Sequence, residues 1–271
     1  MKNISFFLLV FFIAGCSTAP KRLPDVLILR DSAYTQMDLA NREADKGNYP
    51  LALELIGPAR DLAIRTDDPV LLIKTNLSWG NALFSLGRKD EALKAWEEAA
   101  LEADRTGDRE LAALCGIYRE RSRLFSVLGG HGGGVEAIRD QVQNLLGQVR
   151  NDRFAQALGW TVIGLAEKEL RRYAEAEGAL KKSAAIHDAG FFLEQAALDW
   201  YLIASVRSTS GDYDGALAAL NGALGYDRRS ENSYGLGKDW QAMGDVLSKA
   251  GRAAEAAAAY RRSAAIFAAL E

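Results

Sequence analysis

Three tryptophans stand at a constant spacing: Trp160, Trp200 and Trp240 are 40 residues apart, and an alanine follows each of them by 16 residues. A fixed period of this length is typical of a solenoid, in which each unit buries its apolar face only against its neighbours. Stacked units form one extended surface instead of a closed pocket with converging catalytic groups. The spacing therefore predicts a binding scaffold and not an enzyme.

The composition agrees with a helical repeat and argues against a nucleic-acid partner. Apolar residues make up 49% of the chain, enough to bury a sizeable core, and the helix formers Ala, Leu, Glu, Arg and Lys are abundant. The formal net charge is -3, and basic and acidic residues are interspersed. We expect none of the concentrated positive field that phosphate backbones require.

The repeat divides residues 27–271 into six units, each expected to form two antiparallel helices. In the second unit, Pro69 follows Asp67 and Asp68, which suits the start of a helix, and Gly87 separates the first helix from the second. Gly107 stands where the end of a helix commonly needs a positive φ. The six units span 28–67, 68–107, 108–151, 152–190, 191–230 and 231–271.

Small residues recur at one position of each helix, where they would let the two helices of a unit approach closely. In the first helices the series is Ala40, Gly80, Ser122, Gly164, Ala204 and Gly244. In the second helices it is Ala52, Ala92, Ala137, Ala176, Ala216 and Ala256. The turn between the helices carries Gly47, Gly87, Gly129, Gly211 and Gly251, and the fourth unit has Arg171 in that place.

These positions resemble the tetratricopeptide repeat, most clearly over residues 76–87 and 211–217. The usual period of that repeat is about 34 residues, so the sequence is closer to the lengthened variant of some spindle-orientation adaptors and bacterial peptide-sensing regulators. The resemblance implies an all-α, right-handed superhelix of six helical hairpins, with the first helices lining the concave wall. HEAT and armadillo arrays have similar periods and are the alternative, but the glycine turn and the paired small positions favour the tetratricopeptide unit.

The N-terminal residues form a predicted export signal. Lys2 precedes the apolar run 4–13, which is too short to span a bilayer as a helix of about 20 residues. The motif at residues 13–16, Ile-Ala-Gly-Cys, resembles the lipobox of bacterial lipoprotein signal peptides. That resemblance implies removal of residues 1–15, attachment of palmitate and other acyl chains at Cys16, and a tether over residues 16–26. The alternative is an ordinary signal peptide cleaved near Ala19.

The lipobox also implies a location. In diderm bacteria a residue other than aspartate after the cysteine, here Ser17, resembles the default for delivery to the outer membrane. We therefore expect a lipid-anchored protein of the bacterial cell envelope, at the outer membrane. Cys115 is the only other cysteine, so no intrachain disulfide is expected despite the oxidising compartment.

Two motifs invite catalytic interpretations that the rest of the sequence does not support. Residues 131–134, His-Gly-Gly-Gly, match the oxyanion-hole signature of some esterases, but no Gly-x-Ser-x-Gly elbow occurs in the chain. We interpret the glycine-rich segment 129–134 as a lengthened turn. His187 lies at the end of a second helix, where the helix dipole favours positive charge, which indicates a structural role. With two histidines in the chain, no metal or cofactor is expected.

The helical register separates core residues from candidate binding residues. The three periodic tryptophans each precede a small packing residue by four positions, so we assign them, with Trp79 and Trp96, to the core between helices. The opposite stripe of the first helices should face the concave wall, where amide and cationic side chains suit the backbone and carboxylates of an extended peptide. This predicted stripe comprises Tyr34, Met37, Asn41, Lys74, Leu77, Asn81, Phe84, Arg119, Arg123, Thr161, Lys168, Tyr201, Ser205, Lys238, Gln241 and Asp245.

These observations predict a lipid-anchored protein-interaction scaffold that binds a protein or peptide partner, of the kind that serves envelope assembly machines. The alternative is a transporter-accessory or receptor protein that binds a small solute or peptide. The last helix ends with Ile266, Phe267 and Leu270, an apolar edge through which self-association is possible. Its many alanines and the pair Arg261-Arg262 favour the monomer.

The lipobox predicts the effect of one substitution. Cys16→Ala should abolish lipid modification and leave a soluble or an uncleaved species, whereas Cys115→Ala should leave fractionation unchanged. Mass spectrometry of the mature N-terminus and membrane fractionation measure both effects. An unmodified mature N-terminus at or near Ala19 would contradict the lipoprotein interpretation.

Overall fold

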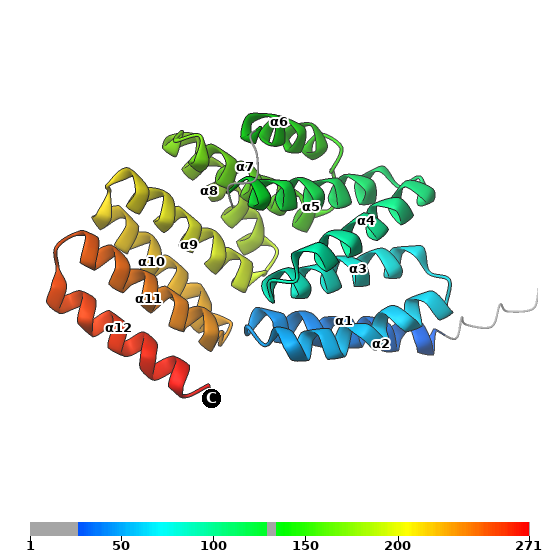
Figure 1. The fold of residues 1–271 in the computed structure, drawn as a ribbon, viewed down its shortest axis with the longest axis horizontal. Coiled ribbons are helices and arrows are strands. Elements are labelled where there is room, and N and C mark those ends of the chain that lie inside the picture. Colours follow the sequence, from blue (N-terminus) through cyan, green and yellow to red (C-terminus); the bar gives the residue numbers. More distant parts are fainter. Residues whose placement is uncertain (1–26, 129–133, 271) are drawn as a thin grey trace, which may run out of the picture.

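The chain folds into six consecutive helical hairpins (Figure 1). The computed structural model describes residues 27–128 and 134–270, so the predicted signal, Cys16 and most of the glycine-rich turn lie outside the described residues. Within the described part, all regular structure is helical. The helices are α1 (Ile28–Asp45), α2 (Tyr49–Arg65), α3 (Pro69–Ser85), α4 (Lys89–Thr106), α5 (Arg109–Leu128), α6 (Val135–Leu146), α7 (Arg153–Glu169), α8 (Tyr173–Ala189), α9 (Leu193–Ser210), α10 (Tyr213–Arg229), α11 (Ser233–Lys249) and α12 (Ala253–Ala268).

Polar caps and left-handed turn residues set the helix boundaries. Asp68 caps α3, because its side chain accepts a hydrogen bond from the Leu71 N–H at 3.0 Å and Pro69 occupies the first helical position. Between the helices of a hairpin the chain needs one residue with positive φ. Gly87 supplies it at 78°. In the fourth hairpin Arg171 adopts the same conformation at 59°, so the turn is retained although the glycine is not.

Each hairpin is held by a close approach of its two helices. All six small residues of the first-helix series are buried, as predicted. A Cβ atom added at Gly164 would lie 2.6 Å from Leu180 Cγ and 3.2 Å from the Ala176 carbonyl oxygen. At Gly244 it would lie 2.5 Å from the ring of Tyr260. These positions are small because the partner helix already fills the space.

The second-helix series is correct in five units and wrong in the third. Ala52, Ala92, Ala176, Ala216 and Ala256 are buried, and each is the fourth residue of its helix. Ala137 is exposed instead. Because α6 begins at Val135, its fourth residue is Ile138, and Ile138 is fully buried. The late start of α6 after the glycine-rich segment shifts the buried position by one residue.

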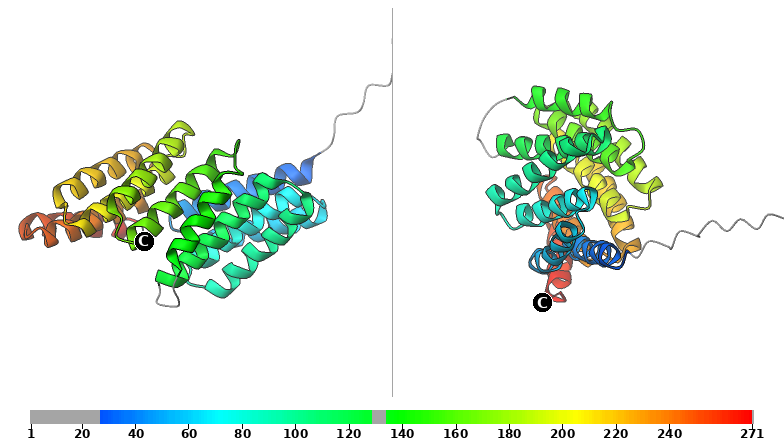
Figure 2. Two further views of the ribbon diagram at one scale, coloured as in Figure 1. Left: turned by 90° about the horizontal axis from the view of Figure 1, so that it is seen from above. Right: turned by 90° about the vertical axis from the view of Figure 1, so that its right-hand side faces the viewer.

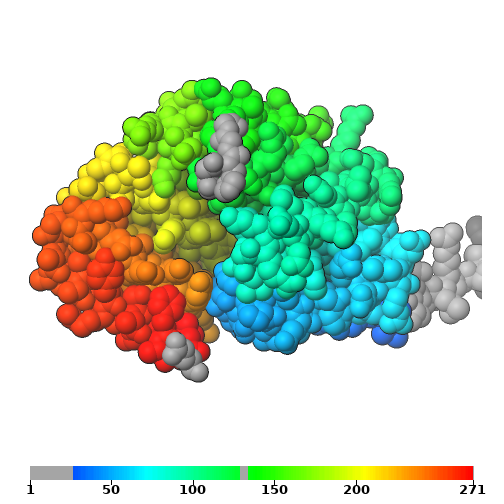
Figure 3. Space-filling model, in the orientation of Figure 1, coloured from blue at the N-terminus to red at the C-terminus, as the bar shows by residue number. Residues whose placement is uncertain are grey.

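The hairpins stack along a curved path that brings the two ends of the solenoid together (Figures 1 and 2). First helices contact one another, α1 with α3, α5 with α7, α7 with α9 and α9 with α11, whereas no pair of second helices makes a contact of similar extent in the described chain. The first helices therefore form the inner wall. In the space-filling view the N-terminal hairpins touch the C-terminal ones (Figure 3).

The tryptophans belong to the core, as the register predicts. Three buried apolar clusters follow one another along the solenoid, and Trp79, Trp160, Trp200 and Trp240 pack against them as partly buried side chains. Trp96 is fully enclosed. On their outer side, Lys182 Nζ lies 4.0 Å from the ring centroid of Trp160, and the Arg262 guanidinium carbon 4.7 Å from that of Trp240. No helix in the described ranges has the length and apolarity needed to cross a bilayer.

The glycine contacts predict opposite effects of two helix substitutions. Gly164→Leu overpacks the α7–α8 contact and should lower the free energy of unfolding by about 1–3 kcal/mol or more. Gly178→Ala, on the same hairpin, meets no atom within 4 Å and should raise stability by about 0.5–1 kcal/mol, because alanine loses less backbone entropy in a helix. Urea unfolding followed by circular dichroism measures both, and equal tolerance at the two sites would show that the helix contact is misplaced.

Candidate functional site

The inner wall brings one part of the predicted stripe together into a groove. This α9–α11 groove lies between the two helices and has a volume of about 120 Å³. Three predicted residues, Tyr201, Ser205 and Asp245, lie along it, and Lys168 of α7 reaches its edge by donating a hydrogen bond to Ser205 Oγ at 2.7 Å. The groove is lined by Tyr201, Ala204, Ser205, Ser208, Thr209, Leu220, Ala242, Asp245, Val246 and Lys249.

Two lysines meet at one end of the α9–α11 groove. Lys249 Nζ lies 3.5 Å from Ser208 Oγ, one helical turn from the Ser205 hydroxyl that Lys168 contacts. Burial lowers the pKa of Lys168, and the charge of Lys249 adds to this shift, while Glu169 opposes it. Within the part of the chain that the structure describes, neither ammonium group has a carboxylate within 4.0 Å. The C-termini of the helices that carry these lysines stabilise their positive charges. The two ammonium groups remain available to a bound anion.

Polar groups complete the groove on the side of α11. Burial raises the pKa of Tyr201, with further contributions from the charges of Asp239 and Asp245. Asp245 accepts a hydrogen bond from the Tyr260 hydroxyl at 2.7 Å, so it does not pair with Lys249 one turn further along α11. The groove therefore offers hydroxyl and ammonium donors over an apolar floor that includes Leu220 and Val246.

A second cluster centres on Arg121, which the sequence analysis did not single out. Its guanidinium donates to Asn81 Oδ1 at 2.6 Å and lies 4.7 Å from the Tyr118 ring centroid and 5.3 Å from that of Trp96. Burial lowers the pKa of this guanidinium, and its Nε finds no hydrogen-bond partner among the described residues. Asn81 also donates to the Tyr118 hydroxyl at 3.3 Å.

The position of Arg121 in the repeat was a usable signal. It directly precedes the small residue Ser122, a place where the other hairpins have Leu39, Trp79, Ile163, Ile203 and Met243. A cation in a register otherwise filled by large apolar side chains is unusual, because an uncompensated buried charge is costly. The two aromatic rings and the Asn81 amide supply the compensation here.

Two predicted stripe residues lie in the core and are not available to a partner, and a third is partly buried. Met37 is 8% exposed and Leu77 4% exposed, so those two predictions are wrong. Phe84 is partly buried and packs against Trp96 and Phe125, with ring centroids 5.7 and 5.2 Å apart. The stripe drawn from sequence was too wide, because the inner helices of a tightly curved solenoid pack against each other as well as against their own partners.

Thr161 belongs to a buried hydrogen-bond network. Its hydroxyl donates to Asp199 Oδ1 at 3.0 Å and lies 2.9 Å from Ser183 Oγ. The other carboxylate oxygen of Asp199 lies 2.7 Å from His187 Nδ1. His187 and Asp199 are both buried, and they join α8 to α9 across the boundary between two hairpins. His187 therefore has a structural role, as predicted, through a partner twelve residues later.

The remaining stripe residues of the N-terminal half form small surface groups. Lys74 Nζ lies 5.9 Å from the ring centroid of Tyr34, which joins the inner faces of the first two hairpins. Arg119 and Arg123 are exposed and flank the buried Glu120, with N···O distances of 4.0 and 2.6 Å. Glu120 neutralises part of their charge, and both side chains stay open to solvent.

Three further stripe residues are exposed and lie apart from the α9–α11 groove. Asn41 and Gln241 are open to water on α1 and α11. Lys238 is also exposed, and its Nζ lies 5.9 Å from the ring centroid of Tyr234. These side chains can contact a ligand that runs along the wall, but the protein itself does not position them.

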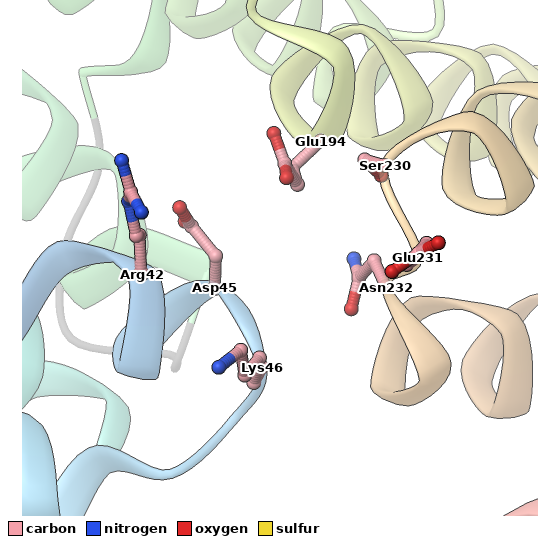
Figure 4. A pocket seen from close by; sticks show the side chains of 7 residues that line it. All are labelled: Arg42, Asp45, Lys46, Glu194, Ser230, Glu231 and Asn232. Atoms are coloured by element: carbon pink, nitrogen blue, oxygen red, sulfur yellow. The ribbon is translucent and has the colours of Figure 1, made fainter. Parts of the chain in front are cut away.

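A larger recess lies where the two ends of the solenoid meet (Figure 4). Its volume is about 340 Å³. Its walls come from α1 and the following turn on one side, and from α9 and the α10–α11 turn on the other. The recess is lined by Arg42, Asp45, Lys46, Glu194, Ser230, Glu231 and Asn232.

Metal and thiol chemistry find no support in the described residues. Over residues 27–128 and 134–270, no group of three His, Cys, Asp or Glu side chains is arranged to hold a metal ion. Cys115 is buried, and burial together with the charge of Asp104 raises the pKa of its thiol to about 12. Cys115 is therefore protonated at neutral pH and unreactive.

Comparison with solved structures confirms the fold. No family model matches the sequence, and no curated protein matches it. A Rap protein complexed with Competence and Sporulation Factor superposes with a TM-score of 0.64 over 88% of this chain and 76% of its own, at 16% identity. The apo form of RapI gives 0.54 over 88% and 76%, at 12% identity. A thermophilic tetratricopeptide-repeat protein of Thermus thermophilus gives 0.53 over 75% and 98%, at 19% identity. The chain is a tetratricopeptide-like α-solenoid.

The buried joint between α8 and α9 generates a stability prediction. Asp199→Ala leaves the His187 ring nitrogen and the Thr161 hydroxyl without their acceptor and should lower the free energy of unfolding by about 1–3 kcal/mol. Asp188→Ala removes an exposed carboxylate next to His187 and should change it by less than about 0.5 kcal/mol. Urea unfolding at neutral pH measures the difference, and equal effects would mean that the joint contributes no net stability.

Proposed function

We propose that this protein is an interaction scaffold whose inner wall binds an extended, acidic segment of a protein partner. The α9–α11 groove supports the proposal, because its two ammonium groups and its row of hydroxyls are donors without a carboxylate partner. Extended segments expose backbone carbonyls and side-chain carboxylates that such donors bind.

The charge of the wall supports an acidic ligand. The predicted stripe contains five cations, Lys74, Arg119, Arg123, Lys168 and Lys238, and one acid, Asp245, although the whole chain has a formal net charge of -3. The predicted stripe is thus more basic than the chain as a whole, although Glu120 offsets part of the charge of Arg119 and Arg123. Complementary charge raises the association rate and selects partners, and both effects weaken with salt.

The structural neighbours give this proposal its precedent. One of them is a Rap protein in complex with Competence and Sporulation Factor. At 16% identity the likeness concerns the fold alone. It supports the idea that a solenoid of this curvature accommodates a bound factor, and we assign the chain a binding role and no catalytic one.

We further propose that acylation of Cys16 anchors the scaffold to the bacterial envelope, at the outer membrane. The lipobox at residues 13–16 supports the anchor, and the tether of residues 16–26 would keep the solenoid within about 35 Å of the bilayer at about 3.5 Å per residue. A scaffold held there suits an envelope assembly machine.

A receptor for a small solute is the second candidate function. The recess between the solenoid ends favours it, because its volume of about 340 Å³ falls in the range of small-molecule sites. Its lining is almost entirely charged and polar, so the solute would be polar too. The inner wall remains the better supported site, since its two ammonium groups have no carboxylate partner in the described part of the chain.

The proposal predicts a charge-dependent peptide affinity. Binding of the full-length protein to a random peptide array should favour acidic sequences, and Lys168→Glu with Lys249→Glu should weaken the best binders at least tenfold, because the groove would then repel carboxylates. Lys94→Glu, an exposed lysine on the outer helix α4, is the matched control. Fluorescence anisotropy at two salt concentrations measures affinity. Equal losses in both variants, or no preference for acidic peptides, would overturn the proposal.

A further inference from the structure

The two ends of the solenoid are in direct contact although they are far apart in sequence. The ring of Tyr234, at the start of α11, contacts the turn after α1. A Cβ atom added at Gly47, in that turn, would lie 2.8 Å from three atoms of the Tyr234 ring. Burial, together with the neighbouring Tyr234, raises the pKa of Tyr49 at the start of α2. The sixth hairpin therefore closes against the first.

Carboxyl groups from both ends face each other across the recess beside this contact (Figure 4). Asp45 belongs to the end of α1, and Glu194 to the start of α9. Asp45 is exposed at the rim of the recess, and partial desolvation there, followed by the charge of Glu194, raises the pKa of its carboxyl group. Arg42 and Lys46 also line the recess, but no ion pair within 4.0 Å joins either of them to Glu194 in the described chain.

A second carboxyl pair lies behind the recess, in the joint where α10 packs against α11. Asp227 of α10 and Asp239 of α11 are 3% and 2% exposed, and their carboxyl groups share a hydrogen bond. Asn232, which lines the recess, donates to Asp227 Oδ1 at 3.0 Å. Among the described residues, Asp239 Oδ2 is buried and accepts no hydrogen bond from a donor group. Two carboxyl groups that share a hydrogen bond need a proton between them.

The repeat shows how unusual this joint is. His187 and Asp199 stand 40 residues before Asp227 and Asp239, so the same joint one hairpin earlier contains an imidazole and a carboxylate 2.7 Å apart. The last joint replaces the imidazole with a second acid. The second pair therefore joins two acids where the first joins an acid to a base, and it needs a proton between its carboxyl groups.

We propose that Asp45, Asp227 and Asp239 form an acid-stabilised latch beside Glu194, which holds the first and sixth hairpins together while these three groups hold protons and releases the contact when they ionise. Ionisation would place two negative charges inside the α10–α11 joint and one on Asp45, opposite Glu194 across the recess. The sixth hairpin would then pivot on the fifth, and Tyr234 would leave Gly47.

The direction of the pH dependence follows from the protonation of the closed state. Burial raises the pKa of Asp239 to about 8, and the adjacent Asp227 adds to this. Burial also raises the pKa of Asp227 to about 6, while Asn232 opposes the shift. Once hydrated in the open state, these groups return to ordinary values near 4. The closed state therefore binds more protons than the open state, and its advantage falls as the pH rises from about 4 to about 8.

The other charged and titratable groups around the latch modify this range without reversing it. Arg228 of α10 lowers the pKa of Asp239, and Glu194 of α9 raises that of Asp227. Tyr201 of α9 also lies close to the latch, and the charge of Asp239 contributes to the raised pKa of Tyr201. On the recess side, Arg42 and Lys46 stand near Asp45, and Glu231 adds a further negative charge.

Hydrogen exchange of the full-length protein in detergent tests the latch directly and without a ligand, so its outcome is independent of the proposed binding function. After correction for intrinsic rates, protection of residues 44–49 and 231–236 should fall at least tenfold between pH 6 and pH 9. Protection at the His187–Asp199 joint should change much less over the same range. Constant protection of the first two segments in the wild type would overturn the proposal.

Substitutions separate the latch from general loosening at high pH. Asp45→Asn with Asp239→Asn removes the ionisable groups and should keep both segments protected at pH 9, whereas Asp38→Asn, an exposed change on α1, should behave as the wild type. If the double variant does not fold, Asp45→Asn alone should shift the midpoint of the loss to higher pH. A variant that loses protection with the wild-type midpoint would contradict the latch.

Discussion

The close approach of a small residue on each first helix to the second helix of the same hairpin is the contact on which the structure depends. Gly164 against Leu180 and Gly244 against Tyr260 leave no room for a Cβ atom. Because the paired helices are so close, each hairpin behaves as a slab with one apolar side toward each neighbour. Stacking six slabs with the first helices in mutual contact produces the curved inner wall, and continued curvature brings hairpin six back to hairpin one.

Local signals of the repeat were sufficient to predict the hairpins. The tryptophan spacing, the small series and the turn glycines indicated an all-α solenoid, and the turn survives even at Arg171, where glycine is absent. The prediction failed at Ala137, because the glycine-rich segment delays the start of α6 and moves the buried place to Ile138. A periodic pattern predicts the contacts within a unit and between adjacent units. An insertion shifts which residue of the following helix occupies the buried position.

The candidate site was harder to predict, because it depends on contacts between hairpins. The stripe included Lys168, Tyr201, Ser205 and Asp245, which do meet in one region, but it also included Met37 and Leu77, which are buried. Lys249 and Ser208 were missed, since their meeting depends on the angle between α9 and α11. The acids that directly precede Trp200 and Trp240 were a visible signal of buried joints, whereas the closure of the ends, 187 residues apart between Gly47 and Tyr234, had no local signal.

The central claim is that the inner wall, and not the outer helices or the recess at the ends, is the surface that binds a partner. Hydrogen-exchange difference mapping of the full-length protein with and without a saturating acidic peptide tests it most directly. The account predicts added protection along α7, α9 and α11 around Lys168, Ser205 and Lys249. Added protection confined to α8, α10 and α12, or to the residues that line the recess, would contradict it.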